Sequence, residues 1–193
     1  PITGVDREGY IYMPDHNLYV AKQRTHLGKN WYDAHNALHQ ENSRMLTLRE
    51  FVDFLLLLRN GNDEFKRLYN EITEVKSPWR SEWIDADFKV VNGVLHMNYN
   101  HRNNSGNLQP QNSEALEICL MKDCKADLSS FNRQGLPTRE GNDFNYWFPR
   151  SDNNSVARFY ADSDWARLDC YGDPQNSGSD SALGVRSARR AAP

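Results

Sequence analysis

Small and apolar side chains alternate with polar and aromatic ones over residues 159–171, near the carboxyl end of the chain. A period of two is typical of a strand that buries one face. The alternation changes phase at residues 165–166, which predicts a turn or bulge there. We therefore expect two neighbouring strands that bury one set of side chains and display the other. The set expected to be buried comprises Phe159, Ala161, Ser163, Ala166, Leu168 and Cys170.

The set expected to be displayed has an unusual composition for a protein surface. Ordinary surfaces carry many Lys and Glu side chains, whereas recognition surfaces favour Tyr, Trp, Arg and short polar side chains. The alternative is a solvated sheet face whose aromatic rings cover the edge of a core. The displayed set comprises Tyr160, Asp162, Asp164, Trp165, Arg167, Asp169, Tyr171, Gly172 and Asp173.

Periodicity and turn signals predict most of the remaining elements. Asn30 is a helix cap, and Thr47 with Glu50 forms a capping box. Asn92-Gly93 is typical of a tight hairpin turn. We expect the amino-terminal hairpin to pair with the last strand. The predicted strands are residues 9–13, 18–22, 83–91, 93–99 and 183–187, and the predicted helices are residues 31–40, 48–58 and 63–73.

Other segments carry weaker patterns. Residues 100–113 are dense in Asn, Ser, Gly and Gln, which predicts an exposed loop. Residues 114–121 fit a strand better than a helix, and residues 122–140 are expected to be irregular. The aromatic run at residues 144–148 is expected to fix its segment to the core.

Size and charge limit the classes of function. A chain of 193 residues with 38% hydrophobic content suffices for one domain, residues 1–193. A net charge of −3 gives no reason to expect nucleic acid as a partner. Neither a membrane-spanning run nor a signal peptide is visible. We expect a soluble protein and leave open whether it stays in the cytoplasm or is displayed at a surface through a partner.

Two histidines four residues apart, His35 and His39, lie on the first predicted helix. This spacing occurs in zinc proteases, but those need Glu directly after the first His, and here the residue is Asn36. We therefore interpret both as partly exposed, hydrogen-bonded histidines and expect no metal site.

Three cysteines complete the candidate chemistry. Cys119, Cys124 and Cys170 are odd in number and lack the paired spacings of a zinc site, so we expect reduced thiols. No nucleophile elbow or phosphate-binding loop occurs. The sequence thus predicts that the protein is not an enzyme and needs no cofactor.

Three ordered blocks near the carboxyl end resemble a known family. They read Val156-Ala157-Arg158-Phe159, then Ala166-Arg167-Leu168-Asp169-Cys170, then Ser181-Ala182-Leu183-Gly184-Val185-Arg186. The segment is similar to the variable region of proteins diversified by diversity-generating retroelements, in which such blocks form a fixed frame.

The resemblance implies an α+β, C-type-lectin-like fold with two main helices packed on short antiparallel sheets and long irregular loops. Trp31, Ala34 and Leu46 are similar to the helix pattern of that fold. A variable ligand-binding region would occupy about residues 155–189.

The resemblance also implies a function. The positions between the frame residues would be rewritten by adenine-directed mutagenesis to display a hypervariable ligand-binding surface. The ligand is expected to be a macromolecule, a protein, with the oligomeric state left open. The alternative is a metal-dependent enzyme or a calcium-dependent lectin on the same fold. The implied ligand-binding positions are Tyr160, Asp162, Asp164, Trp165, Arg167, Asp169, Tyr171, Gly172, Asp173 and Asn176.

Overall fold

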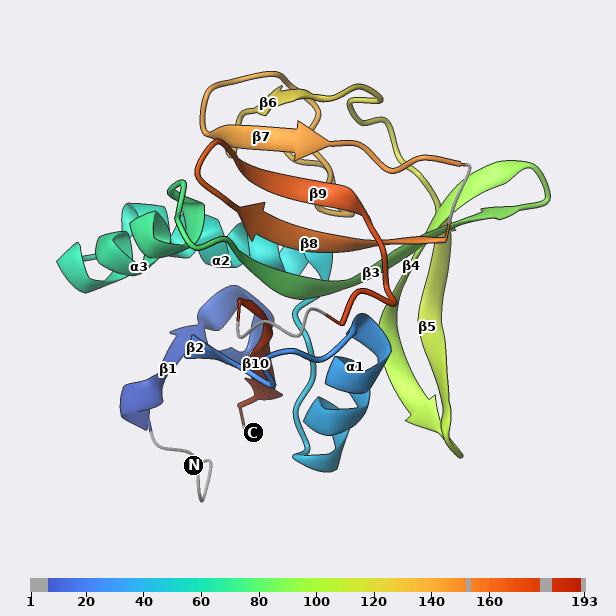
Figure 1. Cartoon of the computed structure of the whole chain (residues 1–193), viewed down its shortest axis with the longest axis horizontal. Coiled ribbons are helices and arrows are strands. Elements are labelled where there is room, and N and C mark those ends of the chain that lie inside the picture. The colour runs from blue at the N-terminus through green and yellow to red at the C-terminus, as the bar shows by residue number, and fades with distance from the viewer. Residues whose placement is uncertain (1–6, 152–153, 178–181, 192–193) are drawn as a thin grey trace.

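A single mixed β-sheet forms the centre of the molecule (Figure 1). The computed structural model describes residues 7–151, 154–177 and 182–191. Eight strands follow one another across the sheet in the order β1-β2-β10-β3-β8-β9-β7-β6, and β4 and β5 continue from β3 as a hairpin. The strands are β1 (Tyr10–Met13), β2 (Leu18–Thr25), β3 (Arg80–Val91), β4 (Val94–Asn104), β5 (Asn107–Ala115), β6 (Cys124–Ala126), β7 (Phe144–Trp147), β8 (Ser155–Ala161), β9 (Ala166–Gly172) and β10 (Leu183–Arg190).

The three α-helices of the described chain confirm the sequence predictions. They are α1 (Trp31–Gln40), α2 (Leu48–Asn60) and α3 (Asp63–Thr73). The Asn30 side chain accepts a hydrogen bond from the backbone N–H of Asp33, and Thr47 and Glu50 form the expected capping box. Because each cap satisfies backbone donors that the first turn leaves free, these boundaries were readable from sequence.

Strand β3 organises the sheet because it pairs with three neighbours. Its first part lies parallel to β10 and its last part antiparallel to β4, while β8 pairs with it on the other edge. The pairing with β8 shifts register between Trp83 and Asp87. This strand therefore connects the carboxyl-terminal strands to the rest of the fold.

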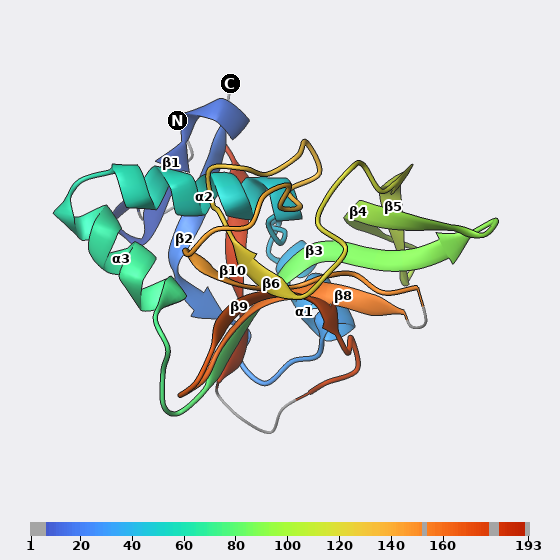
Figure 2. The same ribbon diagram turned by 90° about the horizontal axis from the view of Figure 1, so that it is seen from above.

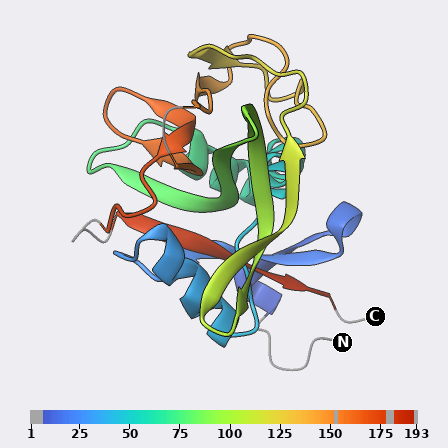
Figure 3. The same ribbon diagram turned by 90° about the vertical axis from the view of Figure 1, so that its right-hand side faces the viewer.

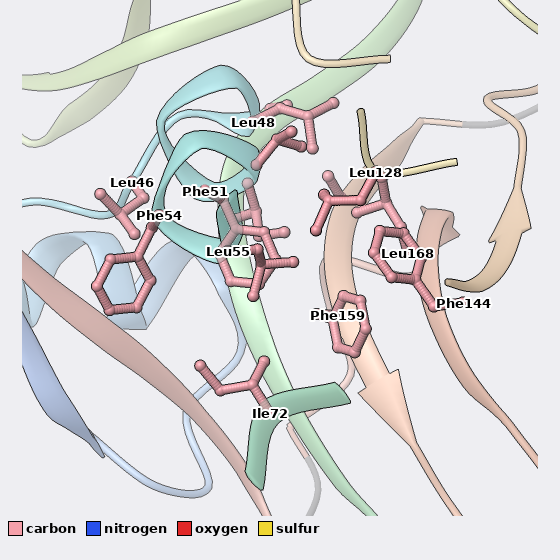
Figure 4. Packing of buried hydrophobic residues seen from close by; sticks show 14 of the residues in the cluster. Leu46, Leu48, Phe51, Phe54, Leu55, Ile72, Leu128, Phe144, Phe159 and Leu168 are labelled. Atoms are coloured by element: carbon pink, nitrogen blue, oxygen red, sulfur yellow. The ribbon is translucent and has the colours of Figure 1, made fainter. Parts of the chain in front are cut away.

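Two hydrophobic clusters lie against the sheet. The larger one joins α2 and α3 to the inner sides of β8 and β9, where the Phe51 ring lies 5.8 Å from the Phe159 ring (Figure 4). The smaller one joins Trp31 and Leu38 of α1 to Trp83 and other residues. Figure 2 shows α1 and α2 on opposite sides of the sheet. Around β3 and β10 the two faces of the sheet are thus covered by different helices.

The amino-terminal hairpin pairs with the last strand, as the sequence predicted. Strands β1 and β2 form an antiparallel hairpin, and β10 pairs antiparallel with β2. The Asn92-Gly93 turn is also confirmed, because both residues have positive φ, 50° and 80°, as a tight hairpin turn requires.

The expected fold class is wrong. Instead of two main helices on short antiparallel sheets with long irregular loops, the described residues form three α-helices and one ten-stranded mixed sheet. Strands β3 and β4 extend over 12 and 11 residues, so both are longer than the strands predicted at residues 83–91 and 93–99. The frame-block resemblance covered the carboxyl end alone, so it carried no information about the length of these strands.

Residues 100–113 form most of a hairpin rather than the expected loop. Strands β4 and β5 pair antiparallel up to Asn104 and Asn107, and Ser105 and Gly106 make the turn with φ of 52° and 87°. The hairpin extends beside α1 (Figure 3). Its side chains are mostly exposed, so backbone pairing holds it without the apolar alternation on which the prediction depended.

The segment after β5 also differs from the expectation. Only Glu114 and Ala115 of the strand predicted at residues 114–121 belong to a strand. The aromatic run forms β7, whose Phe144 and Tyr146 are buried as predicted. Across the described residues, no helix combines the length and apolar character needed to cross a membrane.

Candidate functional site

The two faces of the β8–β9 pair differ as the alternation predicts. Phe159 lies opposite Leu168, and Tyr160 lies opposite Arg167. Five residues of the expected inner set are buried in the larger cluster: Phe159, Ala161, Ala166, Leu168 and Cys170. The sixth, Ser163, is exposed in the turn between the strands, so its expected burial is wrong. Complete burial raises the pKa of the Cys170 thiol well above its usual value, so this side chain acts as a small apolar group.

A stack of aromatic rings and guanidinium groups crosses the outer face. The rings of Trp79 and Tyr160 stack 5.6 Å apart. The guanidinium carbon of Arg167 lies 4.4 Å from the Tyr160 ring centre and 3.7 Å from that of Trp147 on β7. Such cation–π contacts hold the Arg167 side chain flat against the sheet. The stack therefore forms a rigid, partly aromatic platform.

An ion pair lies next to this stack. Asp169 on β9 accepts a hydrogen bond of 2.9 Å from Nε of Arg158 on β8, and its other oxygen accepts one from the backbone N–H of Tyr171. Asp169 is only 1% exposed. Its negative charge is therefore neutralised by Arg158 and is not exposed at the surface.

The turn between β8 and β9 carries the most accessible side chains. Asp162 accepts hydrogen bonds from the backbone N–H groups of Asp164 and Trp165, which fixes the turn. Trp165 is 51% exposed. A hollow of about 300 Å³ lies beside it, lined by Trp147 and Asn145 among others. An exposed indole at a shallow hollow is typical of a contact residue.

A second hollow, of about 510 Å³, lies at the other end of β9. Tyr171, Gly172 and Asp173 line it together with Tyr32 of α1. The Arg150 guanidinium carbon lies 4.6 Å from the Tyr171 ring centre. Asp173 accepts a hydrogen bond from the backbone N–H of Gln175, so the loop after β9 is ordered at this point.

The ten predicted positions fall into three groups by exposure. Asp164, Trp165, Asp173 and Asn176 are exposed, and Tyr160, Asp162 and Tyr171 are partly buried. Arg167, Asp169 and Gly172 are buried. Seven of the ten therefore reach solvent, in two groups separated by the length of β9, about 20 Å.

The expectation that Arg167, Asp169 and Gly172 are displayed is corrected by the structure. Arg167 is clamped between two rings, and Asp169 pairs with Arg158. A Cβ atom on Gly172 would lie 2.9 Å from the carbonyl oxygen of Val156, closer than real contacts allow. Alternation alone assigned these residues to the outer face without showing that neighbours cover them.

Several residues of this surface were not predicted. Trp79 and Trp147 complete the aromatic stack, and Tyr32 completes the second hollow. Tyr32 and Trp79 lie far from β8 and β9 in sequence, and Trp147 lies on another strand, β7. The aromatic run at residues 144–148 was the signal that could have found Trp147. Ser181 of the third frame block lies outside the described residues.

Aromatic rings and carboxylates gather where the turn between β8 and β9 meets the outer face. The side chains at this end of the surface are Trp79, Trp147, Tyr160, Asp162, Asp164 and Trp165. They combine rigid rings with two carboxylates, while Arg167 lies buried beneath them. Aromatic rings beside carboxylates favour a partner that carries cationic groups. No model of a known protein family matches the chain, and no curated protein does either.

Proposed function

We propose that this protein binds a macromolecular ligand through the outer face of β8 and β9, and that a diversity-generating retroelement rewrites this face. One observation carries the proposal. The blocks that resemble the fixed frame supply buried side chains, whereas most positions between them reach the surface.

The burial of the frame gives this division a physical basis. Phe159, Leu168, Leu183 and Val185 lie in hydrophobic clusters, and buried Arg186 pairs with Glu82 at 2.9 Å. Substitution of packed or paired residues is costly, whereas substitution of exposed residues rarely exceeds about 0.5 kcal/mol. A surface diversified by mutation needs this separation, because each copy must still fold.

The same reasoning narrows the set of exchangeable positions. Tyr160, Asp162, Asp164, Tyr171, Asp173 and Asn176 remain as candidates, since all of them reach solvent. Their residue types can all arise by randomising the adenines of an asparagine codon. Trp165 cannot arise in that way, so we assign it the role of a fixed contact residue.

The ligand proposed for this copy is a protein with a cationic patch. Asp162 and Asp164 at one end and Asp173 at the other leave the surface acidic. The nearby Arg158 and Arg167 are covered, and Arg150 pairs with Asp123 at 3.0 Å. Complementary charge speeds encounter and selects partners. The exposed Trp165 indole would supply apolar contact area beside these charges.

Sequencing of the surrounding DNA tests the origin of the surface. The expected result is a neighbouring reverse transcriptase gene and an adenine-rich, near-identical copy of the segment that encodes residues 156–186. Differences between the two copies should fall on codons of the six candidate positions. Absence of the repeat, or differences spread evenly over frame codons, would remove the retroelement from the proposal.

A paired library experiment tests the binding surface directly. One library randomises Tyr160, Asp162, Asp164, Tyr171, Asp173 and Asn176. The control library randomises the inner residues Ala161, Ala166, Leu168 and Cys170. The outer library is expected to yield folded variants and binders to unrelated target proteins. Equal folding and equal binder recovery from both libraries would contradict the proposal.

A further inference from the structure

Two histidine side chains and one aspartate side chain converge in the interior, away from the outer face of β8 and β9. His35 comes from α1, Asp85 from β3 and His101 from β4. Asp85 Oδ1 lies 3.7 Å from His35 Nε2 and 2.5 Å from His101 Nδ1. All three side chains are buried, and Trp31 packs edge-on against both imidazoles.

His35 differs from the description expected for it. It is wholly buried rather than partly exposed, and neither ring nitrogen has a hydrogen-bond partner among the described residues. A buried polar group without a partner costs free energy, and such groups are rare in folded proteins. Packing alone leaves this side chain unexplained.

The neighbours of His101 orient it as a ligand. Its Nε2 lies 3.1 Å from Asp87 Oδ1, while Nδ1 faces Asp85. A metal-binding histidine commonly donates its second ring N–H to a carboxylate in this way. The backbone N–H of His101 also donates to Asp85 Oδ2 at 3.1 Å, which leaves Oδ1 facing the two imidazoles.

The spacing of these atoms fits a small transition-metal ion. Ligands of tetrahedral zinc, at about 2.0–2.1 Å from the metal, lie about 3.3 Å from one another. The observed separations of 3.7 and 2.5 Å bracket that value. Side-chain movements of under about 1 Å would therefore equalise them. Two imidazoles with one carboxylate favour zinc over calcium or magnesium, which prefer oxygen ligands alone.

We propose that His35 Nε2, Asp85 Oδ1 and His101 Nδ1 bind a zinc ion, with Asp87 holding His101 in position. Three protein ligands leave one tetrahedral position for a water molecule. The ion would join α1 to β3 and β4, and so would fix the helix against the sheet. The site shares no residue with the ligand-binding face.

An ion-pair network without metal accounts for only part of the arrangement. His101 lies between Asp85 and Asp87, so these three groups could satisfy one another through a proton. That network leaves both nitrogens of His35 without a partner. A zinc ion would bind His35 Nε2 and would therefore also account for the burial of His35.

Metal loading of the full chain tests this proposal. The protein is stripped with a chelator, incubated with one equivalent of Zn²⁺ and desalted, and bound zinc is measured by elemental mass spectrometry. We expect one zinc per chain and a higher Tm than in the stripped protein. Failure of the wild-type chain to retain zinc would overturn the proposal.

Substitutions locate the ion. His35→Gln and His101→Gln should each abolish zinc retention, whereas the control His96→Gln, on β4 but outside the cluster, should retain it. Retention by His35→Gln equal to that of the wild type would place the ion elsewhere and overturn the proposal.

Cobalt substitution decides the question even where these variants fail to fold. Co²⁺ bound to the wild-type protein should give the visible absorption of a tetrahedral site. It should show no thiolate charge-transfer band, since Cys119, Cys124 and Cys170 are not ligands. A thiolate band, or the weak absorption of an octahedral ion, would overturn the assignment.

Discussion

Asp169 and Arg158 form a buried ion pair across the β8–β9 strands, with 2.9 Å between the carboxylate oxygen and Nε. The side chains are 1% and 14% exposed. Arg158 belongs to the frame, whereas Asp169 was expected to vary. Because truncation of one partner leaves the other charge largely covered and without its counter-ion, the pair makes Asp169 part of the structure rather than of the exposed outer face.

Asp169→Ala should therefore lower the free energy of unfolding by about 3–5 kcal/mol, as expected when a buried pair loses one partner. Asp164→Ala, at the exposed turn on the same surface, should change it by no more than about 0.5 kcal/mol. Urea denaturation of both variants measures the difference. Equal stability of the two would show that Asp169 is free to vary.

Trp165 and Tyr160 should separate binding from stability. Trp165→Ala removes an exposed indole. Binding of a target protein that is recognised by the parent chain should therefore be lost, while the Tm stays nearly unchanged. Tyr160→Ala removes a partly exposed ring that stacks on Trp79 and Arg167, and should cost about 0.5–1.5 kcal/mol of stability as well. Tyr160→Phe keeps the ring and is the matched control. A stability loss on Trp165→Ala as large as that on Tyr160→Ala would contradict this assignment.

Gly172→Ala tests whether this position tolerates any side chain. The new Cβ would meet the Val156 carbonyl oxygen at 2.9 Å, so we expect a loss of about 1–3 kcal/mol. Gly9→Ala is the control, because nothing lies within 4 Å of a Cβ placed there. Thermal unfolding compares the two. A neutral Gly172→Ala would return this residue to the set of exchangeable positions.

The Arg44–Glu50 pair should make stability depend on pH. Burial alone would raise the pKa of Glu50, but its hydrogen bonds and charge pairing with Arg44 outweigh burial and lower that pKa below the usual value. A carboxyl with a lowered folded-state pKa stabilises the fold above its unfolded pKa, about 4.5. This contribution is lost as the pH falls through the lower folded-state pKa.

Urea unfolding of the wild type and Glu50→Gln at pH 7 and at pH 3 measures this contribution. The stability gap between the two proteins should be largest at pH 7 and should narrow on acidification. Glu64→Gln, which removes an exposed carboxylate beside Lys22, is the control and should change the pH profile far less than Glu50→Gln, because solvent screens an exposed pair. A gap of constant size from pH 7 to pH 3 would exclude Glu50 as the source.

Local signals in the sequence were enough to fix many elements. The caps at Asn30 and Thr47, the Asn92-Gly93 turn and the alternation around Phe159 and Leu168 each act within a few residues. For this reason they predicted α1, α2, the β3–β4 turn and the inner face of β8 and β9. The same alternation identified most of the candidate ligand-binding positions.

Only the tertiary structure decided which outer residues are covered and which distant residues meet. Trp147 and Arg158 cover Arg167 and Asp169, although nothing in the local pattern of β9 distinguishes these two from Tyr171. Strand pairing, which depends on backbone groups shared by all residues, turned the polar segment 100–113 into a hairpin. Pairing of β4 with β3 and packing of α1 against the sheet brought His101, Asp85 and His35 together, which the spacing of His35 and His39 could not reveal.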